Sequence, residues 1–366
     1  MRYSDEELYL RCGLEYIKSR EHCPLMCNPE HTPLAKFVYG IMLRYTGLEG
    51  LRLFLFSIYI SLILIIFILY KNKIIGLKYA FVSALLVELN PLILSLYSSA
   101  LLDDVMLLFL AASFVLLSFG ENPYLVVAAL FFALSVMAKE ASLVVLAVYA
   151  LFVLVLWARR RESARVRRHT YFIVYTVIFI IILYTIFYSP CIASRGFSST
   201  MHEILSGYRY EHHLHGFRLV ISMISVSKML TGVEVWKYYN VTFNIVNNTI
   251  TIGSYRYAGY LLMFTPAEYS PVATVFPIAV IWLLLERPEK RRALMEDVSV
   301  MWATGGFVLG MLGPMAWYYA PYNVFATIAL ARHLPRRALL VLLVTEAAYL
   351  VWIIAFNHRL FYSLVI

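Results

Sequence analysis

The residues best suited to chemistry lie in the first fifty positions. Asp5 and Glu6 form an acid pair in SDEELYL, and His31 and Lys36 follow within NPEHTPLAKFVYG, residues 28–40. A carboxylate can take a proton from a hydroxyl, and an imidazole or ammonium can stabilise a negative leaving group. Because the rest of the chain is largely apolar, this combination predicts catalysis on a lipid-borne molecule at a membrane surface.

Further ionisable residues are expected on the same face as this segment. Asp103 and Asp104 open one apolar stretch, and Lys139 and Glu140 separate two others. Ionisable groups at membrane depth are costly and generally functional, so their recurrence predicts a polar cavity. Lys36 and Lys139 could hold a phosphate as point charges.

The four cysteines allow two interpretations. His22, Cys23, Cys27 and His31 carry the ligand types that bind zinc, although C-x3-C alone is a loose pattern. The other interpretation is a disulfide, for example between Cys23 and Cys27 or from this segment to Cys191.

Composition determines the kind of element that must position these residues. The chain is 61% hydrophobic and 14% charged, with a mean hydropathy of +0.74, whereas soluble domains average about 25% charged residues. A spanning helix needs about 20 apolar residues. Apolar segments of that kind predict an all-α polytopic membrane protein with about ten spans: 53–70, 75–96, 105–120, 122–138, 141–158, 170–194, 269–285, 298–331 divided at Gly313-Pro314, and 338–357.

The basic residues predict the orientation of these spans. Alternate loops collect Lys71, Lys73, the arginines of ARRRESARVRR, and the basic groups of 287–292 and 332–337 on one side. By the positive-inside rule this side is cytoplasmic, so residues 1–50 and the loop after Cys191 face outside a cell membrane. The formal charge of +9 comes mainly from this set. It fits contact with anionic lipid headgroups rather than with nucleic acid.

Four regions follow along the chain. Residues 1–50 form an external segment with two interfacial helices, one amphipathic over 5–20 and one starting near Pro33. Residues 51–190 hold spans one to six, and 270–366 hold spans seven to ten. Residues 191–269 form an external loop with a helix near 199–209 and a β-hairpin about Asn247-Asn248, where Thr and Val alternate on either side.

Several of these motifs resemble protein O-mannosyltransferases. Asp5-Glu6 with Tyr9 is similar to the DE…Y signature of that family, and His31-Thr32-Pro33-Leu34-Ala35-Lys36 is similar to HPPLAK, with Thr32 in place of the first proline. Glu49-Gly50-Leu51-Arg52, Leu102-Asp103-Asp104, Met137-Ala138-Lys139 and WYYAPYNVFATIALA continue the likeness. The broader group is the GT-C membrane glycosyltransferases, which include the aminoarabinose transferase of lipid A. The family has a span ahead of its acid motif, and here such a span would have to be encoded upstream of Met1.

The resemblance implies a specific reaction. A sugar, typically mannose in such a family, would move from a polyprenyl- or dolichyl-phosphate carrier to a hydroxyl of a protein, lipid or glycan on the non-cytoplasmic face, with inversion. Asp5 would be the general base, and Glu6 would orient the acceptor or hold the local fold. Tyr9, His31, Lys36, Asp103 and Lys139 would bind the substrate and the lipid phosphate. A divalent cation, Mg or Mn, stays open as a cofactor.

Two other functions compete with this one. Glu88, Asn90 and Asp103 could mark the path of a solute through a transporter, which predicts charges at mid-membrane and inverted repeats. No such repeat is recognisable, and the charges lie at one boundary instead. A non-catalytic membrane scaffold is the third alternative.

Overall fold

The structure is a computed structural model of the 366-residue chain. It describes the chain except residues 1–3, 19–22, 73, 98, 121, 160–162, 216–218, 240, 245–248, 253–257, 265–268, 287–292, 295, 313–315 and 364–366. The turn predicted at Gly313-Pro314 and the one predicted at Asn247-Asn248 both fall outside the described residues.

Each of the ten predicted spans contains a helix. Five described helices are long and apolar enough to cross a membrane: α2, α5, α7, α8 and α16. Shorter apolar helices fill three of the other positions, within α6, α12 and α14. The bounds are α2 Leu34–Lys71, α3 Leu77–Glu88, α5 Leu102–Phe119, α6 Asn122–Ala138, α7 Ser142–Arg159, α8 Ala164–Phe187, α12 Pro271–Leu285, α14 Val298–Met311, α15 Ala320–His333 and α16 Arg336–Ser363. The chain is therefore an all-α polytopic membrane protein, with a small β element described below.

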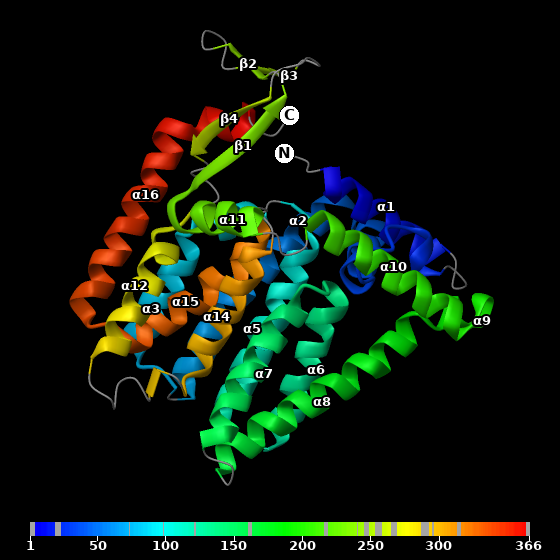
Figure 1. Ribbon diagram of the computed structural model, residues 1–366, viewed down its shortest axis with the longest axis horizontal. Helices are drawn as coiled ribbons and strands as arrows, with labels where there is room; N and C mark the ends of the chain where they lie inside the picture. Colours follow the sequence, from blue (N-terminus) through cyan, green and yellow to red (C-terminus); the bar gives the residue numbers. More distant parts are fainter. Residues whose placement is uncertain are drawn as a thin grey trace.

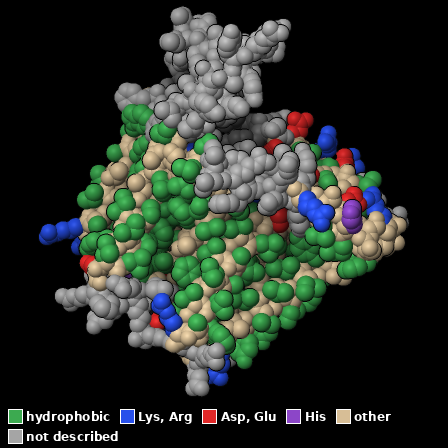
Figure 2. Space-filling view, viewed as in Figure 1, with side chains coloured by type: hydrophobic (Ala, Val, Ile, Leu, Met, Phe, Trp, Pro, Cys, Tyr) green, Lys and Arg blue, Asp and Glu red, His purple; other side chains and the backbone are tan. Residues whose placement is uncertain are grey.

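The helices have a lipid-facing exterior and an aromatic interior. Ile181 on α8, Leu151 on α7 and Val344 on α16 are more than half exposed, and apolar side chains cover most of the visible face between the two ends in Figure 2. Inside the bundle, Trp302 of α14 lies edge-on to Phe132 and Phe325 with ring centroids 5.3 and 5.2 Å apart. Such aromatic pairs bury a large area in a specific geometry, and they fix the rotation of the central helices.

One predicted span differs from expectation in its interior. Residues 75–96 do not form one helix, because α3 ends at Glu88 and a short α4, Pro91–Leu96, begins after Asn90. Asn90 caps α4 by accepting hydrogen bonds from the amides of Leu92 and Ile93. Glu88 is exposed at this break, so it is not part of a buried polar cavity.

The first span is continuous with the second predicted interfacial helix. α2 runs for 38 residues and is interrupted only at Gly47, whose φ of 70° lies in the left-handed region. Glycine adopts this conformation without steric cost. α2 therefore consists of two helical segments that meet at a kink at Gly47, with Lys36 on the first and Lys71 at the end of the second.

The remaining elements gather at one end of the bundle (Figure 1). They are α1 Ser4–Lys18, the 3-10 helix η1 Pro24–Met26, α9 Ser189–Arg195, α10 Phe197–His215, α11 Leu219–Thr231, and strands β1 Val233–Tyr239, β2 Val241–Asn244, β3 Thr249–Ile252 and β4 Ala258–Phe264. β2 pairs antiparallel with β3, as the alternation about residues 247–248 predicted, and β1 pairs with β4 around them. The predicted helix near 199–209 is confirmed as part of α10.

Candidate functional site

The acid pair lies on the first turn of α1, and its two members have different surroundings. This turn carries three acids, and their negative charge interacts favourably with the positive end of the helix dipole. Glu6 is buried, pairs with Arg52 Nη2 at 2.6 Å and accepts a hydrogen bond from the Ala100 amide at 3.2 Å. Asp5 is partly exposed. Glu6 thus ties α1 to α2 and to the segment before α5, whereas Asp5 is the more exposed of the two acids.

Close backbone contact fixes α1 on α2. A Cβ on Gly13 would lie 2.0 Å from the Lys36 carbonyl oxygen, and a Cβ on Gly40 would lie 2.3 Å from the Gly13 carbonyl. Real Cβ atoms do not approach so closely, so both positions need glycine. Two glycines 27 residues apart carry no local signal, so the sequence pattern does not predict this contact.

The loop between α1 and α2 is held by its predicted site residues. His31 Nδ1 lies 2.9 Å from Glu140 Oε1. Lys36 is fully buried, and its Nζ donates to the carbonyls of Asn28 and His31 at 2.7 and 2.8 Å. Thr32, the departure from the family motif, donates its hydroxyl to the Val136 carbonyl at 3.0 Å.

Glu140 is the acceptor that organises this loop, and it was not among the predicted site residues. Besides His31, it accepts a hydrogen bond from the Thr32 amide at 3.3 Å. Burial alone would raise the pKa of Glu140, but the charge and hydrogen bond of His31 outweigh burial and lower the pKa to about 2. Glu140 is therefore a carboxylate at neutral pH. Its position next to Lys139 was the available sequence signal.

A buried ion pair lies beside this loop. Lys139 Nζ, between α6 and α7, contacts Asp103 Oδ2 at 2.8 Å and Oδ1 at 3.1 Å, with both side chains almost fully buried. The same ammonium lies 4.5 Å from the ring centroid of Tyr318 in the 3-10 helix η3, Ala316–Tyr319. Burial alone would lower the pKa of Lys139, but the charge of Asp103 outweighs burial and raises it. Lys139 thus stays protonated.

Tyr9 lies at the centre of these groups. Its ring is edge-on to the His31 imidazole at a centroid distance of 6.0 Å. Burial raises the pKa of its hydroxyl strongly, and the charges of Asp5, Asp103 and Glu140 add to the effect. The hydroxyl therefore stays protonated. One tyrosine close to charges from α1, α5 and the α6–α7 connection shows that the predicted residues converge.

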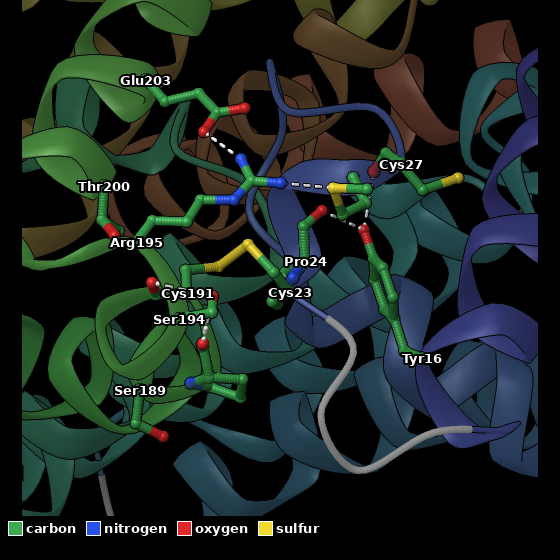
Figure 3. The surroundings of a disulfide bond; sticks show 12 residues. Tyr16, Cys23, Pro24, Cys27, Ser189, Cys191, Ser194, Arg195, Thr200 and Glu203 are labelled. Carbon is green, nitrogen blue, oxygen red and sulfur yellow. Dashed lines mark hydrogen bonds and ion pairs between the residues drawn. A yellow bond between two sulfur atoms is a disulfide. The ribbon is translucent and has the colours of Figure 1, made fainter.

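Two disulfides fasten the elements around this cluster. Cys12 is bonded to Cys27, and Cys23 is bonded to Cys191 (Figure 3). The predicted link from this segment to Cys191 is confirmed, and the Cys23–Cys27 pairing is wrong because each of these cysteines has another partner. Tyr16 donates to the carbonyls of Pro24 and Cys27 at 2.9 and 2.7 Å.

Because Cys23 and Cys27 are both in disulfides, their sulfurs are not available as ligands for the zinc site that the sequence allowed. Within the part of the chain that the structure describes, there is no group of three or more His, Cys, Asp or Glu side chains able to hold a metal ion.

An apolar pocket of about 510 Å³ adjoins the loop on the other side of α2. Phe37 and Ile41 on α2, Phe187 on α8 and Pro190 on α9 supply its apolar wall, and Arg44 is the charged residue in its lining. Arg44 also lies 5.9 Å from the ring centroid of Tyr45. The pocket is large enough for part of a lipid chain.

Comparisons with known proteins define the class of fold. No protein-family model matches the chain, and no curated protein matches it. Among solved structures, the crystal structure of ArnT from Cupriavidus metallidurans bound to undecaprenyl phosphate is similar to this chain. The TM-score is 0.56 at 16% identity, and the match covers 93% of this chain but 58% of ArnT. The chain therefore has a GT-C-like fold and spans little more than half the length of ArnT.

Proposed function

We propose that this chain is a membrane glycosyltransferase. It would move a sugar, mannose by the motif resemblance, from a polyprenyl-phosphate carrier to an acceptor hydroxyl on a protein, lipid or glycan. The observation that carries the proposal is the convergence of Asp5, Tyr9, His31 and the Asp103–Lys139 pair at one end of a GT-C-like bundle. The ArnT structure with undecaprenyl phosphate supports the carrier class.

The reaction follows from the accessibility of the two acids. Asp5 would accept the proton of the acceptor hydroxyl, whose oxygen then attacks the anomeric carbon of the sugar. The bond from that carbon to the carrier phosphate breaks on the opposite side, which inverts the configuration and leaves the electron pair on the phosphate. Glu6 would hold α1 in place, because its Oε1 already contacts both Arg52 and the Ala100 amide.

The leaving phosphate needs positive charge close by. Lys36 and Lys139 are buried and already contact protein oxygens. Lys139 would act through its positive field, and Lys36, whose pKa burial lowers to about 7, mainly through the shape of the loop. The side chain of Arg52 is 32% exposed beside the acid pair. We therefore add Arg52 to the predicted His31, Lys36 and Lys139 as a group that stabilises the phosphate.

The two disulfides support an outward-facing site. Disulfides persist in oxidising compartments and are rare in the cytosol. Both lie at the end that holds Asp5 and Lys139, whereas Arg159, Arg165 and Arg332 lie at the other ends of their helices. Charge bias and cysteine chemistry thus agree on the orientation.

The transporter alternative has little support in the side-chain environment. Asn90 is a helix cap, Asp103 is neutralised by Lys139, and Glu88 is exposed at a helix end. A solute path needs polar groups that are available to the solute.

Asp5→Asn tests the proposal directly. Membranes carrying the variant would be supplied with labelled polyprenyl-phosphate-mannose and assayed for sugar transfer. Loss of a general base lowers transfer by about 10²-fold or more. Glu7→Gln is the matched control, because Glu7 is exposed on the same turn. Undiminished transfer by Asp5→Asn would refute the role of Asp5, and absence of transfer by the wild type would favour a transporter or scaffold.

A further inference from the structure

A polar pocket lies at the end of the bundle opposite to the candidate active site. Its volume is about 420 Å³, and it forms where α5 and α15 end and α8 and α14 begin. Its charged lining consists of Arg165, Arg168, Arg332, His333, Glu296 and Asp297. Ser118, also in the lining, is 15 residues along α5 from Asp103 and therefore about 22 Å away at the helical rise per residue. The pocket is thus separate from the candidate active site.

The acidic side chains of this pocket are already neutralised. Asp297 caps α14 through the Ser299 amide at 2.8 Å, and it accepts from Arg332 Nη1 and His333 Nε2, each at 2.9 Å. Burial would raise the pKa of Asp297, but the hydrogen bond of His333 and the charge of Arg332 lower it. Glu296 Oε2 forms an ion pair with Arg165 Nη1 at 2.8 Å. Both acids therefore remain anions with cationic partners.

Arg168 carries the remaining positive charge. Its Nη2 donates to the carbonyl of Leu117 near the end of α5 at 3.1 Å. Its Nε is buried and has no hydrogen-bond partner among the residues that the structure describes. A guanidinium has five N–H donors in a planar fork, and one carbonyl occupies only one of them. Arg165 lies one turn earlier on α8, so two guanidiniums line the same side of the pocket.

We infer that this pocket binds a phosphate group, either in the headgroup of an anionic phospholipid or as a free phosphate. Arginine forks match phosphate oxygens in bidentate geometry, and a pocket of this size accepts a headgroup. The basic loops place this end on the cytoplasmic side. Basic pockets between helices on that side are suited to anionic lipid headgroups.

Binding is measured on the purified full-length protein in neutral detergent micelles, from the shift of its unfolding temperature with added probe. The probes are dihexanoyl phosphatidylglycerol, inorganic phosphate and, as the zwitterionic control, dihexanoyl phosphatidylcholine. The variant is Arg168→Gln and the matched control is Arg167→Gln, which removes the same charge from an exposed neighbour on α8. Loss of one charge-assisted contact weakens binding about tenfold.

The outcomes separate the two sources of phosphate. Stabilisation by phosphatidylglycerol alone assigns a lipid headgroup, and stabilisation by inorganic phosphate assigns a free ligand. Equal binding by Arg168→Gln and Arg167→Gln, or no stabilisation of the wild type by either anion, overturns the inference. If Arg168→Gln does not fold, Arg165→Gln takes its place, because Arg165 is 56% exposed. Sugar transfer enters none of these measurements, so failure of the proposed function leaves the result unaffected.

Discussion

The ion pair of Asp103 and Lys139 gives the sharpest test of how this site is built. Both side chains are only 2–3% exposed, and both carboxylate oxygens contact the ammonium. Removing one partner of a buried pair leaves an uncompensated charge and costs about 3–5 kcal/mol. Asp103→Asn and Lys139→Met are each expected to lower the free energy of unfolding by that amount. Lys139→Met also loses its contact with Tyr318, about 0.5–2 kcal/mol.

The double variant Asp103→Asn/Lys139→Met separates charge pairing from packing. The double variant leaves no uncompensated charge in the buried site, so it is expected to be more stable than either single variant. The double variant should nevertheless lack sugar transfer, because it has lost the positive charge that Lys139 supplies near the leaving phosphate. A variant that folds but does not transfer thus distinguishes a catalytic role from a structural one.

The assay is equilibrium unfolding in mixed micelles, followed by tryptophan fluorescence. Glu203→Gln is the control, because Glu203 pairs with Arg195 at 2.6 Å with both side chains about one third exposed. Exposed pairs contribute about 0–1 kcal/mol. The reasoning is wrong if Asp103→Asn costs no more than Glu203→Gln, or if the double variant is as unstable as the sum of the single variants.

Three other predictions follow from the geometry around α1. Gly13→Ala should displace α1 and abolish transfer, because its Cβ would lie 2.0 Å from a backbone oxygen; membrane assays measure this. The depressed pKa of Glu140 stabilises the protein above pH about 4.5, and the gain disappears as pH falls towards 2; Glu140→Gln should lack this part of the pH dependence of unfolding. Ser199→Cys, at an exposed position of α10, should be labelled by a membrane-impermeant maleimide from outside intact cells.

Each of these three predictions has a control variant or an outcome that would contradict it. Glu7→Ala on the exposed face of α1 should keep transfer, and full activity of Gly13→Ala would contradict the close packing. Identical acid unfolding of wild type and Glu140→Gln would remove the His31 contact from the stability argument. Labelling of the parent chain, whose four cysteines are paired, would count against the disulfides, and labelling of Ser199→Cys only after the cells are broken would count against the orientation.

Much of the architecture follows from the sequence because it depends on local composition. Apolar length determines which segments become helices in lipid, where every backbone group must be bonded internally. Charge bias between loops predicts an orientation, and alternation about residues 247–248 gives the paired strands β2 and β3. The break at Asn90-Pro91 was also readable in principle, because proline cannot donate to a helix and asparagine caps one.

The pairing of side chains is decided by tertiary structure alone. His31 and Glu140 are 109 positions apart, and Cys23 and Cys191 are 168 positions apart. Which side chains meet depends on the rotation and crossing of helices, and contacts such as Gly13 on Gly40 determine these. The sequence identified Asp5 and Glu6 as a pair of acids. Only packing assigned Glu6 to Arg52 and left Asp5 accessible, because one helix turn presents neighbouring residues to different surroundings.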